Sequence, residues 1–305
     1  MELPIDPTQT DASPQDLIRN LPSQAARHRI LQAVDISINV ENRNFLDLLD
    51  EISQIELRRA ASQLLFAGAR TVYYYRLDGL SQVSPDGAAG GVGDVGSPGA
   101  YGPEVQTALR DHDRIYVVCN VPDTGSQTQL TISEENRPTT VATFKPKTQL
   151  LSVRAPDDGT ADATTQAVLN YFELNNATRI SFLNTGFRER LENAWVKGYS
   201  TLRLSNTNPQ DSSREIEIRS KESERGHIVD VRTDTIVEDL VQRDDTEINE
   251  ATGLVDISSN IRSMEHDEPL HPRVTIGFAD GWVTFEQFVP EKILIEFDDV
   301  VRNSL

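Results

Sequence analysis

The densest group of metal-ligating side chains in this sequence surrounds two histidines, His266 and His271. Three acidic residues stand between positions 265 and 268, and imidazole with carboxylate is a donor set that binds divalent metal ions. This spacing brings two histidines together only on one face of a helix, and Pro269 and Pro272 oppose a helix through this segment. We therefore interpret the segment as an exposed acidic loop and keep a metal-dependent enzyme with a dispersed site as an alternative.

Other motifs that carry chemistry are incomplete. Residues 91–96 match the glycine pattern of dinucleotide sites, but no strand precedes them and Pro98 follows where a helix should begin. Cys119 is the single cysteine, and its apolar neighbours are typical of a buried strand rather than of a reactive thiolate. The sequence has no Walker A loop, no Gly-x-Ser-x-Gly elbow and no His-Glu-x-x-His helix. We predict no catalytic residue and no cofactor.

The net charge of the chain is its strongest signal. There are 48 acidic and 29 basic residues, which give −19 at pH 7, and the basic residues are 24 arginines and five lysines. Repulsion among so many carboxylates destabilises a compact chain in dilute buffer. At 1 M salt the screening length falls to about 3 Å, which removes most of this repulsion. The composition therefore predicts a halophilic protein, and we expect an archaeal source.

The expected location of the protein is the cytoplasm. A single cysteine excludes an internal disulfide, as expected in a reducing compartment. No segment approaches the roughly 18 consecutive apolar residues of a membrane-spanning helix. Residues 1–22 also lack the apolar region of a signal peptide. We predict no membrane partner.

One segment of this acidic chain is basic. Residues 136–206 contain nine basic and six acidic residues, whereas residues 207–305 contain ten and 23. We predict DNA association through eight basic side chains, called the basic island: Arg137, Lys145, Lys147, Arg154, Arg188, Arg190, Lys197 and Arg203. Two other interpretations stay open. Acids are scarce either because the segment is the buried centre of a sheet or because it contacts an acidic surface.

Hydrophobic patterning divides the chain into four regions. Residues 1–80 form a helical domain that ends in a strand at 71–77, and residues 81–103 form a glycine-rich linker or loop. Residues 104–206 carry the basic island in an α-β-β-β-β-α order, and residues 207–305 form an acidic α+β domain. The expected fold class is α+β: an N-terminal helical bundle followed by a mainly antiparallel, meander sheet body that helices cover.

Alternation, helical periodicity and turn residues predict the individual elements of this fold. Expected strands after the first cover residues 114–121, 127–133, 139–144, 150–154, 199–204, 215–219, 227–231, 273–278 and 282–288. Expected helices cover residues 45–64, 103–111, 187–198, 233–242 and 290–305, and another amphipathic helix follows Thr160.

Three stretches carry a resemblance to known families. They are the α-β-β-β-β-α order at 103–175, the run Glu-Arg-Gly-His-Ile-Val-Asp-Val at 224–231, and Glu-Pro-Leu at 268–270 before the strand at 274–278. The first resembles one repeat of the TATA-binding-protein fold. The layout with its helical bundle and the two short runs resemble the centromere protein N family. The resemblance implies a non-enzymatic adaptor associated with chromatin or DNA.

Three functional hypotheses follow from these patterns. The first is a non-enzymatic binding protein, associated with DNA through the basic island. The second is a protein–protein adaptor that uses the N-terminal helices and an exposed sheet edge. The third is the metal-dependent enzyme at His266 and His271. Convergence of the basic island on one exposed face would favour the first hypothesis.

Overall fold

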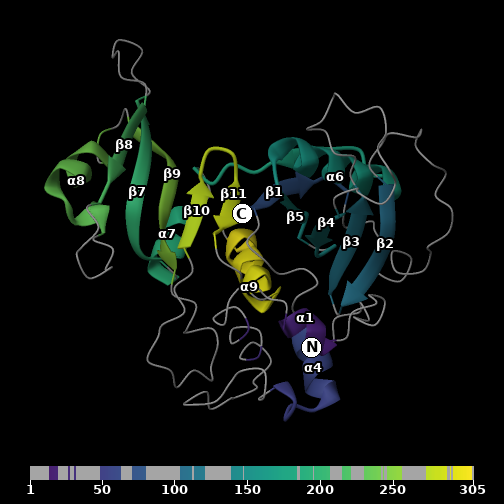
Figure 1. Cartoon of the computed structure of the whole chain (residues 1–305). Helices are drawn as coiled ribbons and strands as arrows, with labels where there is room; N and C mark the ends of the chain where they lie inside the picture. Colours follow the sequence, from purple (N-terminus) through teal and green to yellow (C-terminus); the bar gives the residue numbers. More distant parts are fainter. Residues whose placement is uncertain are drawn as a thin grey trace, which may run out of the picture. The chain divides into compact units, whose positions relative to one another are not determined.

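The computed structural model of this chain contains two compact units. The first unit comprises Met1–Asp6 and Arg70–Ile180, and the second comprises Pro7–Ala69 and Ser181–Leu305. Each unit has an antiparallel sheet with helices packed on it (Figure 1). The structure describes residues 14–19, 27, 31, 49–62, 71–79, 104–111, 113–120, 139–146, 148–183, 186–194, 196–206, 215–220, 230–241, 243, 246–255, 273–286, 289 and 291–303.

The sheet of the first unit has the strand order β2-β3-β4-β5-β1, and each neighbouring pair is antiparallel. Its strands are β1 (Thr71–Leu77), β2 (Glu104–Asp111), β3 (Arg114–Asn120), β4 (Thr139–Phe144) and β5 (Leu150–Ala155). The short strand β6 (Ala177–Arg179) pairs with β1. Valine, threonine and aromatic residues dominate β1, β3 and β4, as expected where side chains pack on a pleated surface.

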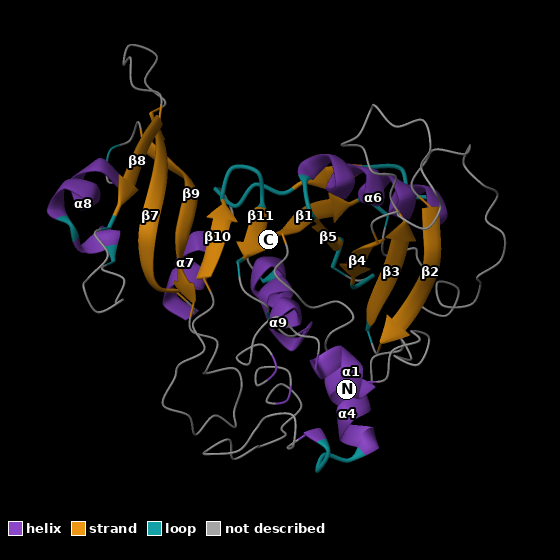
Figure 2. Ribbon diagram, viewed as in Figure 1, coloured by secondary structure: helices purple, strands orange, loops and turns teal. Residues whose placement is uncertain are grey.

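Helix α6 (Asp158–Tyr171) packs on the sheet of the first unit (Figure 2). It begins where Asp157 accepts a hydrogen bond from the Thr160 backbone N–H at 2.8 Å, which satisfies one of the unpaired donors of the first turn. Its buried face consists mainly of alanines and threonines, which are small enough for a close approach. The Thr164 and Thr140 hydroxyls lie 2.8 Å apart across this contact, so the buried polar groups are paired.

The sheet of the second unit has the order β8-β7-β9-β10-β11, and it is also antiparallel throughout. Its strands are β7 (Val196–Asn206), β8 (Glu215–Arg219), β9 (Thr246–Val255), β10 (Arg273–Gly277) and β11 (Trp282–Phe285). The helices of this unit that follow residue 180 are α7 (Phe187–Ala194), the 3-10 helix η4 (Val231–Thr233), α8 (Thr235–Val241) and α9 (Glu291–Arg302).

Aromatic side chains join the helices of the second unit to its sheet. Phe182 stacks on Phe187 of α7 with the ring centroids 4.1 Å apart. Phe297 of α9 makes edge-to-face contacts with Phe187 and with Phe285 of β11, each at 5.7 Å. All four rings are buried, and such pairs add to the stability that burial of the rings provides.

The prediction of an N-terminal helical bundle was wrong for the residues that the structure describes there. Apart from single helical residues at 27, 31 and 49, these residues form two short helices, α1 (Pro14–Arg19) and α4 (Gln54–Ser62). The long helix expected over 45–64 is interrupted at 50–53, because Ser53 and Glu56 form a reciprocal capping pair that starts a new helix. The described fold is mostly antiparallel sheet with few helices.

Further predictions of secondary structure were wrong. The helix expected over 187–198 ends at Ala194, and residues 196–198 belong to β7. The helix expected over 103–111 is strand β2, because hydrogen bonding with the apolar strand β3 overrides local helix preference. Val231, expected at the end of a strand, belongs to η4, where the Asp230 carboxylate caps the turn. The strands expected at 127–133 and 227–229 and the linker at 81–103 lie outside the described residues.

Other elements confirm their predictions. The strand at 71–77 and the strands at 139–144 and 215–219 occupy the expected residues. The hairpin of β10 and β11 turns at Gly281, which adopts φ 61°. The C-terminal helix forms as α9.

Candidate functional site

The first unit contains two described members of the basic island, and both are engaged within the unit. Lys145 Nζ lies 3.3 Å from Asp113 Oδ2. Arg154 is 1 % exposed in β5, so its guanidinium lies in the interior of the unit. Arg137 and Lys147 lie outside the described residues. The two described members of the basic island in this unit therefore do not form an exposed anion-binding face.

The second unit contains the other four members of the basic island. Lys197 and Arg190 are exposed. The other two are ion-paired with glutamates of the same unit, so much of their charge is neutralised locally. These ion pairs join Arg188 to Glu192 and Arg203 to both Glu217 and Glu250.

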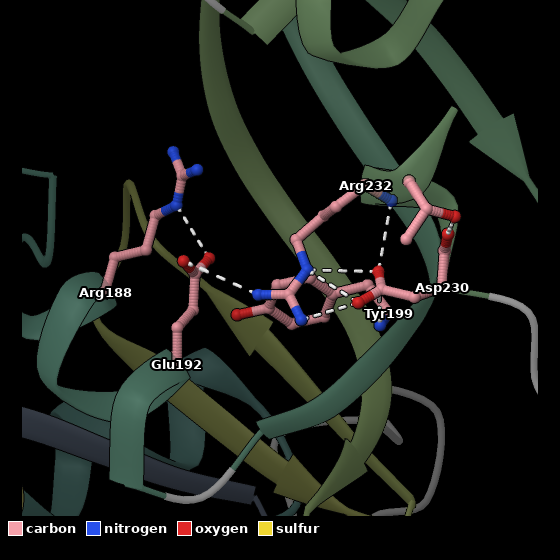
Figure 3. A network of polar contacts seen from close by, with 6 residues as sticks. Arg188, Glu192, Tyr199, Asp230 and Arg232 are labelled. Atoms are coloured by element: carbon pink, nitrogen blue, oxygen red, sulfur yellow. Dashed lines mark hydrogen bonds and ion pairs between the residues drawn. The ribbon is translucent and has the colours of Figure 1, made fainter. Parts of the chain in front are cut away.

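A network of charged side chains surrounds Tyr199 and joins α7, β7 and η4 (Figure 3). Arg232 lies over the Tyr199 ring, 4.9 Å from its centroid, and donates to the Asp230 carboxylate from Nε at 2.9 Å and Nη2 at 2.6 Å. Arg232 Nη1 lies 3.6 Å from Glu192 Oε2, and Glu192 Oε1 accepts a hydrogen bond from Arg188 Nε at 2.8 Å. Two arginines and two carboxylates therefore balance in charge, and we call this group the Tyr199 clamp.

The electrostatics of the Tyr199 clamp suit a structural role. Burial alone would raise the pKa of Asp230, but hydrogen bonds from the side chain and backbone of Arg232 and from the Tyr199 N–H lower it below its ordinary value. Burial, and then the charge of Glu192, raises the pKa of Tyr199 above its ordinary value. A phenol with a raised pKa stays protonated at neutral pH, so Tyr199 offers no nucleophile.

A related cluster lies in the first unit beside the start of α6, and we call it the Tyr75 cluster. The Arg179 guanidinium lies 4.8 Å from the centroid of the Tyr73 ring and 6.0 Å from that of Tyr75. Arg179 Nη2 donates to Asp158 Oδ1 at 2.6 Å, and the Tyr75 hydroxyl donates to Asp162 Oδ1 at 2.7 Å. The cluster also joins a helix to a strand. Burial, and then the hydrogen bond to Asp162, raises the pKa of Tyr75 above its ordinary value, so its phenol stays protonated at neutral pH.

The remaining candidates for chemistry give no site in the described part of the chain. Burial raises the pKa of Cys119 to about 12, so its thiol is protonated and unreactive at neutral pH. Within the ranges that the structure describes, no three histidine, cysteine or acidic residues are grouped to hold a metal ion. His266 and His271 lie outside these ranges.

One face of the second sheet is polar. A row of side chains crosses it at matching register from Arg219 through Thr201, Thr252, Thr275 and Thr284. The hydroxyls of Thr252 and Thr275 lie 3.0 Å apart. We call this side of β8, β7, β9, β10 and β11 the polar face. Its residues alternate with the buried side chains that pack on the helices.

The next row of the polar face ends at a partly exposed tryptophan. Glu217, Arg203, Glu250, Gly277 and Trp282 are neighbours in register across the five strands. The indole of Trp282 lies against Gly277, because a Cβ at Gly277 would stand only 2.2 Å from Trp282 Cε2. A glycine is therefore required there for the ring to lie against the strand.

The carboxylates around Arg203 differ in their electrostatics. Hydrogen bonds from Arg219 and Arg203 lower the pKa of Glu217 below its ordinary value. Burial, the largest effect, raises the pKa of Glu250. The charge of Arg203 opposes this rise, and the charges of Glu217 and Glu215 add to it. The polar face thus presents charged side chains, hydroxyls and one aromatic ring.

Sequence reasoning missed the polar face, although part of its signal was present. The predicted hairpin over 273–288 places Thr275, Gly277, Trp282 and Thr284 on one side by simple alternation. The central strand β9 was not predicted, because its glutamates and Gly253 are poor strand formers. Without β9, the sequence does not connect this hairpin to Arg203.

No helix within the described ranges is long and apolar enough to cross a membrane. The chain matches no known family, and none of the curated proteins matches it by sequence.

Proposed function

We propose that this protein is a non-enzymatic binding protein that acts as an adaptor and holds a protein partner on the polar face. The observation that carries this proposal is the partly exposed Trp282, whose indole lies against Gly277 in the same row as Arg203. Tryptophan and arginine are the residues most enriched among those that dominate binding energy at protein interfaces. A rigid sheet presents them with little loss of conformational entropy on binding.

The state of the basic island supports a protein partner over DNA. Lys145, Arg188 and Arg203 are ion-paired with carboxylates, and Arg154 is buried. DNA would have to compete with these carboxylates. In molar salt, phosphate contacts also contribute little affinity because the gain from counterion release falls steeply with salt concentration.

The composition supports a salt-rich cytoplasm as the place where this adaptor works. Its excess of acidic residues and shortage of lysines are those of a halophilic, archaeal protein, as proposed from the sequence. The binding experiments should therefore be done in about 2 M KCl, where the screening length is near or below 3 Å and repulsion among the acidic residues is mostly screened.

Affinity capture from an extract of the expressing cells, in 2 M KCl, tests this function. The wild-type chain should retain one or more proteins that the double variant Trp282→Ala/Arg203→Ala loses and that the control variant Arg190→Ala keeps. Circular dichroism confirms that all three are folded. Equal retention by all three chains would contradict a role of the polar face.

Titration of a labelled DNA duplex in the same buffer tests the competing function. No saturable change in fluorescence anisotropy is expected. Saturable binding that a Lys145→Glu/Arg190→Glu variant loses and the Trp282→Ala/Arg203→Ala variant keeps would replace the adaptor proposal with DNA association.

A further inference from the structure

Acidic side chains outnumber basic ones on the polar face. The face carries three arginines and five glutamates: Arg203, Arg219, Arg273, Glu215, Glu217, Glu247, Glu250 and Glu286. Each arginine is already ion-paired to a glutamate of the face. In contrast, the side chains of Glu215 and Glu247 make no ion pair within the described ranges, so the uncompensated charge of the face is negative.

Glu250 lies in the same row of the polar face as the partly exposed Trp282. Gly277 separates Glu250 from Trp282 in the same row and has no side chain to stand between them. Arg203 Nη1 approaches Glu250 Oε2 at 3.3 Å, yet burial and the neighbouring Glu217 keep the pKa of Glu250 raised. A carboxylate with a raised pKa is incompletely compensated, and a second cation beside it would be stabilised.

An aromatic face and a carboxylate in the same row favour one class of ligand. The negative face of an indole attracts a guanidinium or ammonium group, and a neighbouring carboxylate adds direct Coulombic attraction. An anionic ligand would have to displace the ion pairs of Arg203, Arg219 and Arg273 and would face the uncompensated glutamates.

We propose that the polar face binds a cationic segment of its protein partner, with an arginine or lysine placed over Trp282 and beside Glu250. This inference rests on the proposed adaptor function and specifies the chemistry of the partner. The partly exposed threonines of the hydroxyl row, Thr201, Thr275 and Thr284, lie along the path of the bound segment.

The test uses three labelled 12-residue peptides in which threonine alternates with arginine, with glutamine or with glutamate. Binding is followed by anisotropy in 2 M KCl with the full chain carrying Trp195→Phe, so that Trp282 fluorescence gives a second signal. The arginine peptide should bind and perturb Trp282, whereas the other two should not. Removing the ring in Trp282→Ala should weaken binding about fivefold, the size expected of a cation–π contact.

Matched charge variants separate the polar face from the general acidity of the chain. Glu215→Gln/Glu250→Gln should weaken the arginine peptide about tenfold, as expected when two charge-assisted contacts are lost. Glu189→Gln/Asp239→Gln removes the same charge from exposed positions of α7 and α8 and should leave binding unchanged. Equal weakening by both pairs would mean nonspecific attraction and would overturn the proposal.

The remaining outcomes distinguish this inference from the adaptor function. Preference for the glutamate or glutamine peptide would overturn a cationic partner while keeping a binding role for the polar face. No peptide binding, together with a captured partner that depends on Trp282 and Arg203, would also overturn the inference and leave the adaptor function standing. If neither peptide binding nor capture of a partner were observed, the proposed adaptor function itself would be rejected.

Discussion

The Tyr199 clamp of the second unit and the Tyr75 cluster of the first unit contain the same chemical parts in different surroundings. Each has an arginine on a tyrosine ring and a carboxylate that accepts from the arginine. In the second unit the Asp230 and Glu192 side chains are only 20 % and 18 % exposed. In the first unit the arginine partner Asp158 is 67 % exposed.

This difference in exposure decides how much each cluster stabilises its unit. An ion pair open to water gains little, because water and salt screen it and the side chains lose freedom. A partly covered carboxylate that also accepts backbone N–H bonds is costly to replace, since those donors lose their partner. Asp230 accepts hydrogen bonds from the Tyr199 and Arg232 backbone N–H groups, so we expect the Tyr199 clamp to stabilise its unit more than the Tyr75 cluster does.

The largest expected effect comes from the strand beneath the clamp. A Cβ in Gly253→Ala would stand 2.4 Å from the Gly198 backbone oxygen and 2.9 Å from Tyr199 Cδ1, and a backbone atom has little room to move. The free energy of unfolding should fall by about 3 kcal/mol. Urea titration in 2 M KCl, followed by tryptophan fluorescence, measures it.

The control for Gly253→Ala is Gly159→Ala in the first unit. A Cβ at Gly159 would make an ordinary 3.4 Å contact with the Asp157 carboxylate, and alanine favours a helix over glycine. Its stability should stay equal or rise by about 0.5 kcal/mol. A Gly253→Ala chain as stable as wild type would refute the close packing of β7 and β9.

The second-largest loss of stability should come from removing the Asp230 carboxylate of the Tyr199 clamp. Asp230→Ala deletes the acceptor of Arg232 and of two backbone N–H groups, and about 2 kcal/mol should be lost at pH 7. Because the pKa of Asp230 in the folded chain is below its ordinary value, its stabilisation is present above that ordinary value and is lost as the pH falls. The difference in the free energy of unfolding between wild type and Asp230→Ala, measured by urea titration, should therefore be smaller at pH 3 than at pH 7. A difference that widens on acidification would contradict this account.

A smaller effect is expected at the inner contact of the Tyr75 cluster. Tyr75→Phe removes the 2.7 Å hydrogen bond to Asp162 while the ring stays buried, which should cost about 1 kcal/mol. Hydrogen exchange of the β1 amides reports this loss in the first unit. No change in their protection would show that water replaces the phenol at no cost.

The smallest effect should come from the exposed ion pair. Asp158→Ala breaks the contact with Arg179, and we expect a change of at most about 0.5 kcal/mol. Hydrogen exchange of β1 and α6 measures it beside Tyr75→Phe. A loss as large as that of Asp230→Ala would remove the distinction between the two clusters.

Local patterns predicted the elements whose residues agree with their surroundings. Three consecutive tyrosines within 71–77 and the threonine-valine run at 139–144 are strands by composition, and both formed as expected. The segment 103–111 was predicted as a helix, and the strand at 246–255 was not predicted. Both contain charged and small residues that favour a strand only because neighbouring strands supply hydrogen bonds, on one side for β2 and on both sides for β9. The polar face was missed with β9, since three strands far apart in sequence meet there.

The sequence by itself determined the acidity, the scarcity of lysine, the absence of a complete catalytic motif and the strands with strong alternation, because these are properties of composition and of adjacent residues. Only the tertiary structure decided that Arg154 is buried, that Arg203 is shared by two glutamates, and that the Trp282 ring lies on Gly277. Strand pairing sets these outcomes. It brings together charges that stand tens of residues apart, and local periodicity carries no information about which strand becomes the neighbour.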